Sequence, residues 1–358
     1  YTQLLLVRIG VSIGEAGAIP PAQSLIADYY DRTKRVQAMA VYSLNGPLSV
    51  IIGFVAGGWL IDNLGWRMAF IVIGIPGILL AILVKFTLKE PRLQQQSTLV
   101  IQHPSIKTVL STLWQRKAFR NIVLAYCVSY FFGTGIVQWL PTFFIRSHSM
   151  EISEVGTWLA FVWGVCGLFG TYLGGVLAGR YAAQREELQM RAVAVIFVLC
   201  GLLYILAYII PSKYLAMLLM TVSGLLFSLC GGPILSAIAS LSNDRMRSMA
   251  IALIFLFANF IGYGFGPILA GVLSDLLEPI VGSESLRYTL VLLSPGYLWV
   301  AYFYWQASKT IEEDIQQVES ESETELVEEK ASSIPELEDE LSTDPRSAVA
   351  DPFGPGKA

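Results

Sequence analysis

The sequence has few charged residues and few groups that carry out chemistry. Charged side chains make up 15% of the 358 residues, against about 25% in a soluble domain. There are two histidines, His103 and His148, and four cysteines that stand singly within apolar stretches. The sequence contains no Cys-x-x-Cys, no His/Cys cluster and no Gly-Lys-Ser/Thr loop. We therefore expect no metal, no cofactor, no enzymatic activity and no ATP-driven pumping, and the scattered basic residues argue against nucleic acid.

Apolar residues are abundant, at 54% of the chain with a mean hydropathy of +0.58. They occur in runs of about twenty or more, the length that crosses a hydrocarbon core of about 30 Å. The pattern predicts an all-α membrane protein with nine transmembrane helices, at about 3–28, 36–61, 68–88, 119–145, 152–179, 190–210, 213–240, 247–274 and 287–308.

Composition divides the chain into four parts. Residues 1–88 hold three predicted spans of an N-terminal bundle, and 119–309 hold a C-terminal bundle of six. Between them, 89–118 is a polar linker in which residues 105–117 repeat apolar side chains at helical spacing. Residues 310–358 hold fifteen acidic and three basic residues, which predicts a disordered acidic tail.

Basic residues predict how the chain is oriented in the membrane. With the predicted spans, sixteen lysines and arginines lie in loops and span ends on one side of the membrane, and four lie on the opposite side. Because cytoplasmic loops are enriched in lysine and arginine, the linker and the tail should be cytoplasmic. Tyr1 then begins on the opposite side, so we expect an odd number of further spans before it.

An internal repeat indicates a transporter. Arg35–Val41 resembles Arg245–Ile251, and Gly58–Asp62 resembles Gly271–Asp275, with both copies running in the same membrane direction. Parallel repeats on either side of a linker are typical of secondary transporters. By symmetry three spans should precede the first one here, so the full protein should have twelve, and the arginines Arg35, Arg180 and Arg245 mark candidate gating loops.

The first span carries two opposite charges, Arg8 and Glu15, seven residues apart, with Ser12 between them. Two helical turns separate the charges, so they share one face. A charge at bilayer depth costs on the order of 3 kcal/mol, which makes such residues functional candidates. Protonation of Glu15 would release Arg8 for an anionic solute, so the pair is a candidate for proton or ion coupling. The alternative is a static ion pair that fixes helix packing.

Other polar residues within the spans are candidates for a solute cavity, because transporters bind near the bilayer midplane between their halves. Each could equally make a hydrogen bond that only stabilises packing. Together with Ser12 the candidates are Tyr42, Asn45, Tyr126, Tyr130, Gln138, Asn259 and Tyr263.

Two segments resemble a known family. The sequence from Arg8 to Asp28, and Gly57–Trp59 followed by Gly65–Phe70 and Gly74–Gly77, resemble the spinster-like branch of the major facilitator superfamily and its bacterial relatives. The resemblance implies that the chain shows the fourth to twelfth helices of that fold. It also implies a carrier in the bacterial inner membrane that moves a small organic or lipid-like, anionic solute by alternating access. Coupling to H⁺ or another ion would involve the arginine and glutamate of the fourth helix.

A second function belongs to another class. The chain could be a receptor or scaffold that displays its acidic tail and moves no solute. Such a protein would need neither a charge pair within a span nor two parallel halves, so these features favour a transporter.

Overall fold

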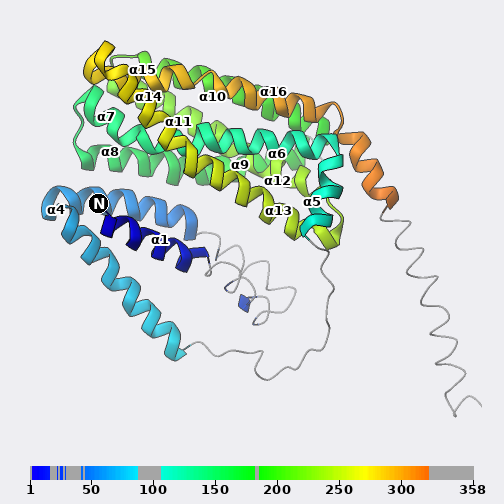
Figure 1. The fold of residues 1–358 in the computed structure, drawn as a ribbon, viewed down its shortest axis with the longest axis horizontal. Helices are drawn as coiled ribbons and strands as arrows, with labels where there is room; N and C mark the ends of the chain where they lie inside the picture. Colours follow the sequence, from blue (N-terminus) through cyan, green and yellow to red (C-terminus); the bar gives the residue numbers. More distant parts are fainter. Residues whose placement is uncertain are drawn as a thin grey trace, which may run out of the picture.

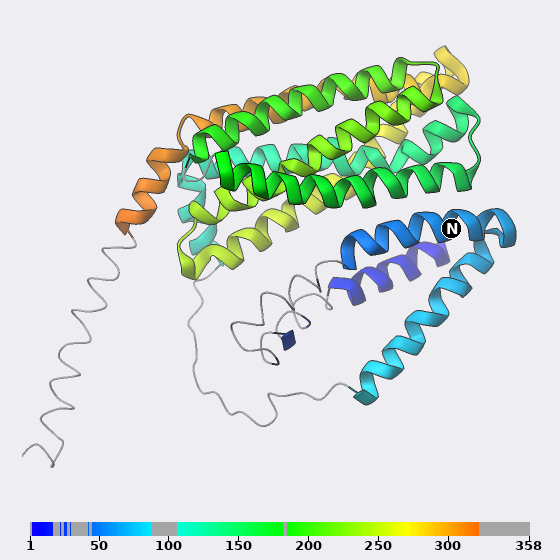
Figure 2. The ribbon, with the colours of Figure 1, turned by 180° about the vertical axis from the view of Figure 1, so that it is seen from behind.

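The computed structural model describes residues 2–16, 22, 25–26, 29, 42, 45–87, 106–181 and 185–321, and nearly all of them are helical. α1 (Thr2–Ala16) lies near α4 (Asn45–Thr87), and we call the two helices the N-terminal half (Figures 1 and 2). The elements from α5 onward form a larger bundle, the C-terminal half. In both views α1 and α4 lie on one flank of this bundle.

Each predicted apolar run contains a described helix. Within the described residues, six helices are long and apolar enough to cross a membrane, by length and composition. Two of the six are double: Leu48–Thr87 turns at Gly65, and Met249–Ser308 turns at Gly282. Both glycines have positive φ, 76° and 62°, a conformation that residues with a Cβ rarely adopt. The predicted turn at 62–67 therefore reverses the chain through Gly65.

The C-terminal half consists of six spans, several of them interrupted. The first two contain α6 (Lys117–Tyr130), η2 (Phe131–Gly135), η3 (Ile136–Trp139) and α7 (Leu140–His148), then α8 (Ile152–Leu159), η4 (Ala160–Val165) and α9 (Cys166–Tyr181). The next two are α10 (Glu186–Ile209), then α11 (Lys213–Leu229) with α12 (Gly231–Ser240). The last two contain α13 (Asp244–Asn259), η5 (Phe260–Phe265) and α14 (Gly266–Val281), then η6 (Gly282–Glu284), α15 (Ser285–Leu293) and α16 (Gly296–Ser308).

The predicted amphipathic helix of the linker is α5 (Ile106–Gln115). Its Val109 and Leu113 are fully buried, whereas Ile106 is 61% exposed. α5 lies across the end of the C-terminal bundle next to α6 and α13 (Figure 1). A single apolar core runs through this half from Val109 to Ile311.

The acidic segment after the last span begins differently from the prediction. Residues 311–321 form a helix with Ile311, Asp314 and Val318 buried. The expectation of disorder from residue 310 is therefore wrong for this stretch, because the apolar residues Ile311, Ile315 and Val318 recur every third or fourth position and pack on the bundle. Residues 322–358 lie outside the described part.

Candidate functional site

The two halves meet along a seam between α4 and the span formed by α8 and η4. A Cβ built on Gly156 would lie 2.6 Å from the carbonyl oxygen of Phe54, and one on Gly58 would lie 3.2 Å from the Cα of Ser153. A Cβ on Gly164 would overlap the side chain of Ile51. Glycine therefore allows the helices of the two halves to approach backbone to backbone.

The seam is confined to one end of this span. Beyond η4, a Cβ on Gly170 or Gly174 would meet the backbone of Leu225 or Leu229, so these glycines of α9 face α11. The seam end contains Asp62 and Ser153, which we call the outer side, following the charge bias of the loops. The halves are thus closed against each other at the outer side.

An ordered polar contact closes the outer end of the seam. The Asp62 carboxylate accepts a hydrogen bond from the backbone N–H of Ser153, at 2.9 Å. Ser153 lies in the first turn of α8, and Glu151 at the N-cap makes no side-chain capping bond. Because the first N–H groups of a helix lack partners and carry partial positive charge, a carboxylate there stabilises the helix. Asp62 of one half therefore caps a helix of the other.

Within the C-terminal half, α6 and η2 cross α13 and η5 at a second glycine contact. A Cβ on Gly262 would lie 2.8 Å from the carbonyl oxygen of Tyr130, and one on Gly266 would lie 2.8 Å from the Cα of Gly135. Both η2 and η5 are single π-helical turns, which occur often at functional sites. The crossing brings the predicted cavity residues of these two spans into one region.

Tyr126 and Tyr130 form a pair at this crossing. The Tyr126 and Tyr130 hydroxyls are 3.1 Å apart and the ring centroids 4.7 Å apart. Tyr126 also meets Phe255 of α13 edge-on, with the centroids 5.8 Å apart. Tyr126 is buried and Tyr130 half-buried, so Tyr130 is the more accessible member of the pair.

An apolar pocket of about 530 Å³ lies one turn along α6 from this pair. Lys107 and Trp114 of α5 form one wall, and Cys127 of α6 and Phe257 of α13 contribute to the others. Lys107 is the one charged side chain that lines it among the described residues. The remaining lining residues are Leu110, Ser111, Val123, Leu124 and Ile261. The pocket suits an apolar group attached to an anion.

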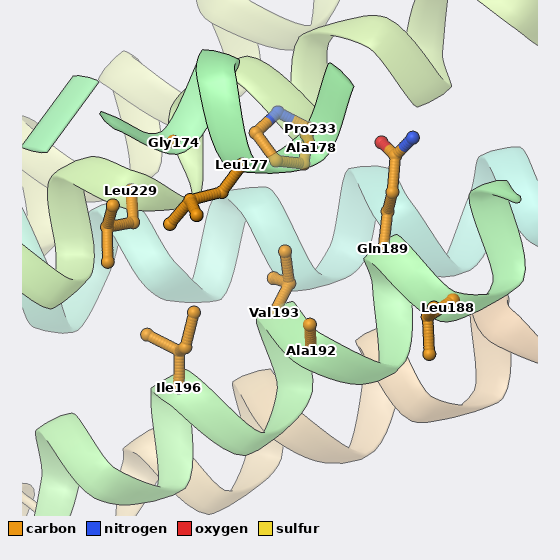
Figure 3. A pocket seen from close by; sticks show the side chains of 10 residues that line it. All are labelled: Gly174, Leu177, Ala178, Leu188, Gln189, Ala192, Val193, Ile196, Leu229 and Pro233. Atoms are coloured by element: carbon orange, nitrogen blue, oxygen red, sulfur yellow. The ribbon is translucent and has the colours of Figure 1, made fainter. Parts of the chain in front are cut away.

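A smaller pocket of about 240 Å³ lies between α9, α10 and the α11–α12 junction. Figure 3 shows Gln189 extending from the start of α10 toward Ala178 and Pro233. The other lining residues are apolar or glycine, and none is charged. An anionic solute therefore fits better next to Lys107 than here.

The charge pair of the first span is described in part. Arg8 is exposed on α1, and its guanidinium carbon lies 5.6 Å from the ring centroid of Phe70 on α4. Ser12 donates a hydrogen bond to the carbonyl oxygen of Arg8, at 3.0 Å. Glu15 lies in α1, but its side chain is outside the described part of the structure. The predicted coupling role of Arg8 and Glu15 stays a prediction.

The remaining candidates form hydrogen bonds within their own segment or are exposed. Asn45 donates to the carbonyl oxygen of Tyr42 at 2.6 Å, and Asn259 to that of Phe255 at 2.7 Å, so both amides bond within their own segment. Gln138 and Tyr263 are exposed. Among the gating arginines, Arg180 is exposed at the end of α9, whereas Arg35 and the side chain of Arg245 lie outside the described residues.

Sequence reasoning did not assign a role to Asp62, Ser153 or Gly156. The repeat ends at Asp62, but no sequence pattern near Asp62 or Ser153 indicates that these two residues, 91 positions apart, form a hydrogen bond. In the described residues no group of three or more His, Cys, Asp or Glu side chains could hold a metal ion.

The fold and the seam define a helical membrane protein built of two halves that close at one side. Comparison with known proteins identifies the family. The family profile of the Major Facilitator Superfamily matches residues 1–267. The chain therefore belongs to the major facilitator superfamily, as its motifs predicted.

Among its relatives is an MFS-type efflux pump of Mycolicibacterium smegmatis, 29% identical over 316 residues, covering 87% of this chain and 72% of the pump. A probable galactarate/D-glucarate transporter, GudP of Bacillus subtilis, is 27% identical over 49% of this chain and 43% of its own length. The chain thus spans less than half of the second relative.

Two solved structures share the fold. Both are crystal structures of a bacterial homolog of the human lysosomal transporter Spinster in an inward-facing conformation, one unoccupied and one occupied. The TM-scores are 0.74 and 0.73 at 23% identity, covering 87% of this chain and 78% of that one. The predicted spinster-like fold is confirmed.

Proposed function

We propose that the full-length protein is a secondary active transporter that moves a small organic or amphipathic anion by alternating access, with proton coupling. It would act in the bacterial inner membrane, with the linker and tail in the cytoplasm. The seam between the halves carries this proposal. A contact made at one end of a two-half bundle through glycine packing and a single polar cap can open without unfolding either half.

Solute recognition is assigned to the region around Tyr126, Tyr130 and the pocket next to Lys107. The paired hydroxyls can hydrogen-bond an anion, the lysine can neutralise it, and the apolar pocket can take a hydrocarbon portion. The relative named as a probable galactarate/D-glucarate transporter supports an organic acid. Efflux of an amphipathic compound is supported by the M. smegmatis relative.

Proton coupling is assigned to Glu15 with Arg8. A protonated Glu15 leaves the guanidinium uncompensated, and an ionised one neutralises it. Arg8 lies within cation–π distance of Phe70, so the arginine has a second partner on α4 when the carboxyl is neutral. Movement of a proton on and off Glu15 would thereby change which partner holds α1.

The receptor or scaffold alternative has less support. A scaffold displaying its tail gains nothing from a glycine seam, a cap between halves or membership of a transporter superfamily. Both alternatives predict membrane insertion, so insertion does not separate them.

The test is counterflow with the full-length protein in proteoliposomes. A panel of labelled organic acids and amphipathic anions is offered with and without a pH gradient. We expect saturable exchange of at least one anion, accelerated by the gradient, and loss of the acceleration in Glu15→Gln. If correctly folded protein exchanges no anion of the panel, the proposal is overturned. If the pH gradient still accelerates exchange in Glu15→Gln, only the proposed coupling through Glu15 is overturned.

A further inference from the structure

Two charged side chains are buried among the described residues, Arg116 and Asp314, which are 5% and 7% exposed. They lie together at the end of the C-terminal half opposite the seam end. Burying a charge is costly unless partners compensate it. Neither residue belongs to the seam or to the pocket next to Lys107, so their burial needs a separate explanation.

Arg116 joins three segments that are distant in sequence. It stands between α5 and α6, its Nη1 donates to the carbonyl oxygen of Leu241 at 2.6 Å, and its Nη2 pairs with Glu321 Oε2 at 2.6 Å. Leu241 ends α12, and Glu321 belongs to the helix 311–321. The guanidinium fork, with donors in fixed directions, suits a carbonyl and a carboxylate at once.

Asp314 makes the second attachment of this helix. Its Oδ2 accepts a hydrogen bond from the backbone N–H of Ala118 at 2.7 Å. Ala118 lies in the first turn of α6, and the N-cap residue of α6, Arg116, makes no side-chain capping bond. Asp314 therefore caps α6 from 196 residues away, while Ile311 and Val318 bury the apolar face of the same helix.

These contacts fix the linker at one of its ends. α5 packs on α6 and α13, and Arg116 follows directly after it. The contacts of Arg116 and Asp314 go to the C-terminal half and to the helix that follows its last span. None of them reaches α1 or α4 of the N-terminal half.

We propose that helix 311–321 is a strap that fastens the linker helix α5 to the C-terminal half, with Arg116 as its positioning residue and Asp314 and Glu321 as its anchors. α5 then moves with the C-terminal half whenever the two halves rearrange. Lys107 and Trp114, which line the larger pocket, keep their place relative to α6 throughout. The acidic segment after the last span is thus part of the working fold over its first turns.

The test uses two truncations of the full-length protein and a distance readout. One variant stops after Lys309 and lacks the strap, and the matched control stops after Glu321 and keeps it. Spin labels replace Ile106 on α5 and Leu188 on α10, both exposed. We expect a narrow distance distribution in the intact protein and in the control, and a distribution at least twice as wide without the strap. An unchanged distribution in the shorter variant would overturn the proposal.

Point variants test the anchors if the shorter truncation does not fold. Glu321→Ala removes the ion pair, and Glu319→Ala changes an exposed acid two residues away and serves as the control. We expect Glu321→Ala and Arg116→Gln to widen the distribution, and the double variant to widen it no further than Arg116→Gln alone. Additive effects, or no effect of Glu321→Ala, would contradict the strap. The readout needs no solute, so its failure is distinguishable from a failure of transport.

Discussion

The carboxylate of Asp62 caps the first turn of α8 through the backbone N–H of Ser153, although 91 residues separate the two. This hydrogen bond of 2.9 Å connects the N-terminal half to the C-terminal half at the outer side. Because α8 has no side-chain cap of its own, opening the seam leaves its first turn with unpaired N–H groups. The cap therefore favours the closed seam over the open one.

Replacing the cap should open the outer side. Loss of an N-cap costs about 1 kcal/mol, so Asp62→Ala should shift the equilibrium toward the open seam by roughly fivefold. Spin labels at Asn63 and Glu151, which flank the bond, report the shift as a larger share of long distances. Asp62→Asn keeps an acceptor oxygen and should move the equilibrium less. Equal effects of the two variants would contradict a capping role.

The glycine seam should be sensitive to a single methyl group. A Cβ on Gly156 would lie 2.6 Å from the Phe54 carbonyl oxygen, whereas one on Gly57 has nothing within 4 Å. Gly156→Ala should therefore increase the distance between labels at Asn63 and Glu151 by about an ångström or more, because neither backbone can yield without moving its helix. Gly57→Ala is the matched control and should leave the distances as they are. Closure in Gly156→Ala would show that the seam tolerates a side chain.

The tyrosine pair should contribute to solute affinity. Tyr126→Phe removes one hydroxyl of the pair, one turn along α6 from the pocket, and keeps the ring contact with Phe255. A hydrogen bond to a charged group contributes about 1.5–3 kcal/mol, so the apparent KM for an anionic solute should rise roughly tenfold or more. Tyr288→Phe, at an exposed site of α15, is the control. Counterflow measures both, and an unchanged KM in Tyr126→Phe would remove the pair from the site.

Protonation of Asp314 should tighten the strap. Burial raises the pKa of the Asp314 carboxyl, while the Ala118 N–H and Arg116 oppose the rise. A raised pKa in the folded state means that ionisation weakens docking, and the penalty grows as pH rises from the unfolded value of about 3.9 through the folded one. Proteolytic cleavage after helix 311–321 should thus slow on acidification within this window. The comparison is made in a Glu321→Ala background, which removes the other carboxylate of the strap that pairs with Arg116. There, Asp314→Asn should abolish the slowing of cleavage on acidification, and the same acid response in that variant would rule Asp314 out.

The sequence supplied the spans and their order, because apolar length and turn residues are local properties. The turn at Gly65, between the predicted spans 36–61 and 68–88, and the linker helix α5 both follow from neighbours within a few positions. Family membership followed from motifs around Arg8 and Gly57–Gly77, which lie within the stretch that the family profile matches.

The contacts between distant segments could not be predicted in the same way. Asp62 with Ser153, and Arg116 with Glu321, depend on how helices pack in three dimensions, and a single sequence carries no record of pairing. The helix at 311–321 was not predicted, because the tail was judged by its overall acidic composition and not by the spacing of its few apolar residues. The π-helical turns η2, η4 and η5 likewise arise from packing, since their residues also fit an ordinary α-helix.

The most direct test of the two-half mechanism is to measure counterflow with the outer end of the seam cross-linked and then released. Cysteines introduced at Asn63 and Glu151 in the full-length protein are joined by a short, cleavable cross-linker. The four cysteines of this sequence are buried and react slowly. Alternating access predicts that cross-linking stops exchange of the transported anion and that cleaving the linker restores it. Exchange that continues at the same rate while the seam is locked would contradict the two-half mechanism.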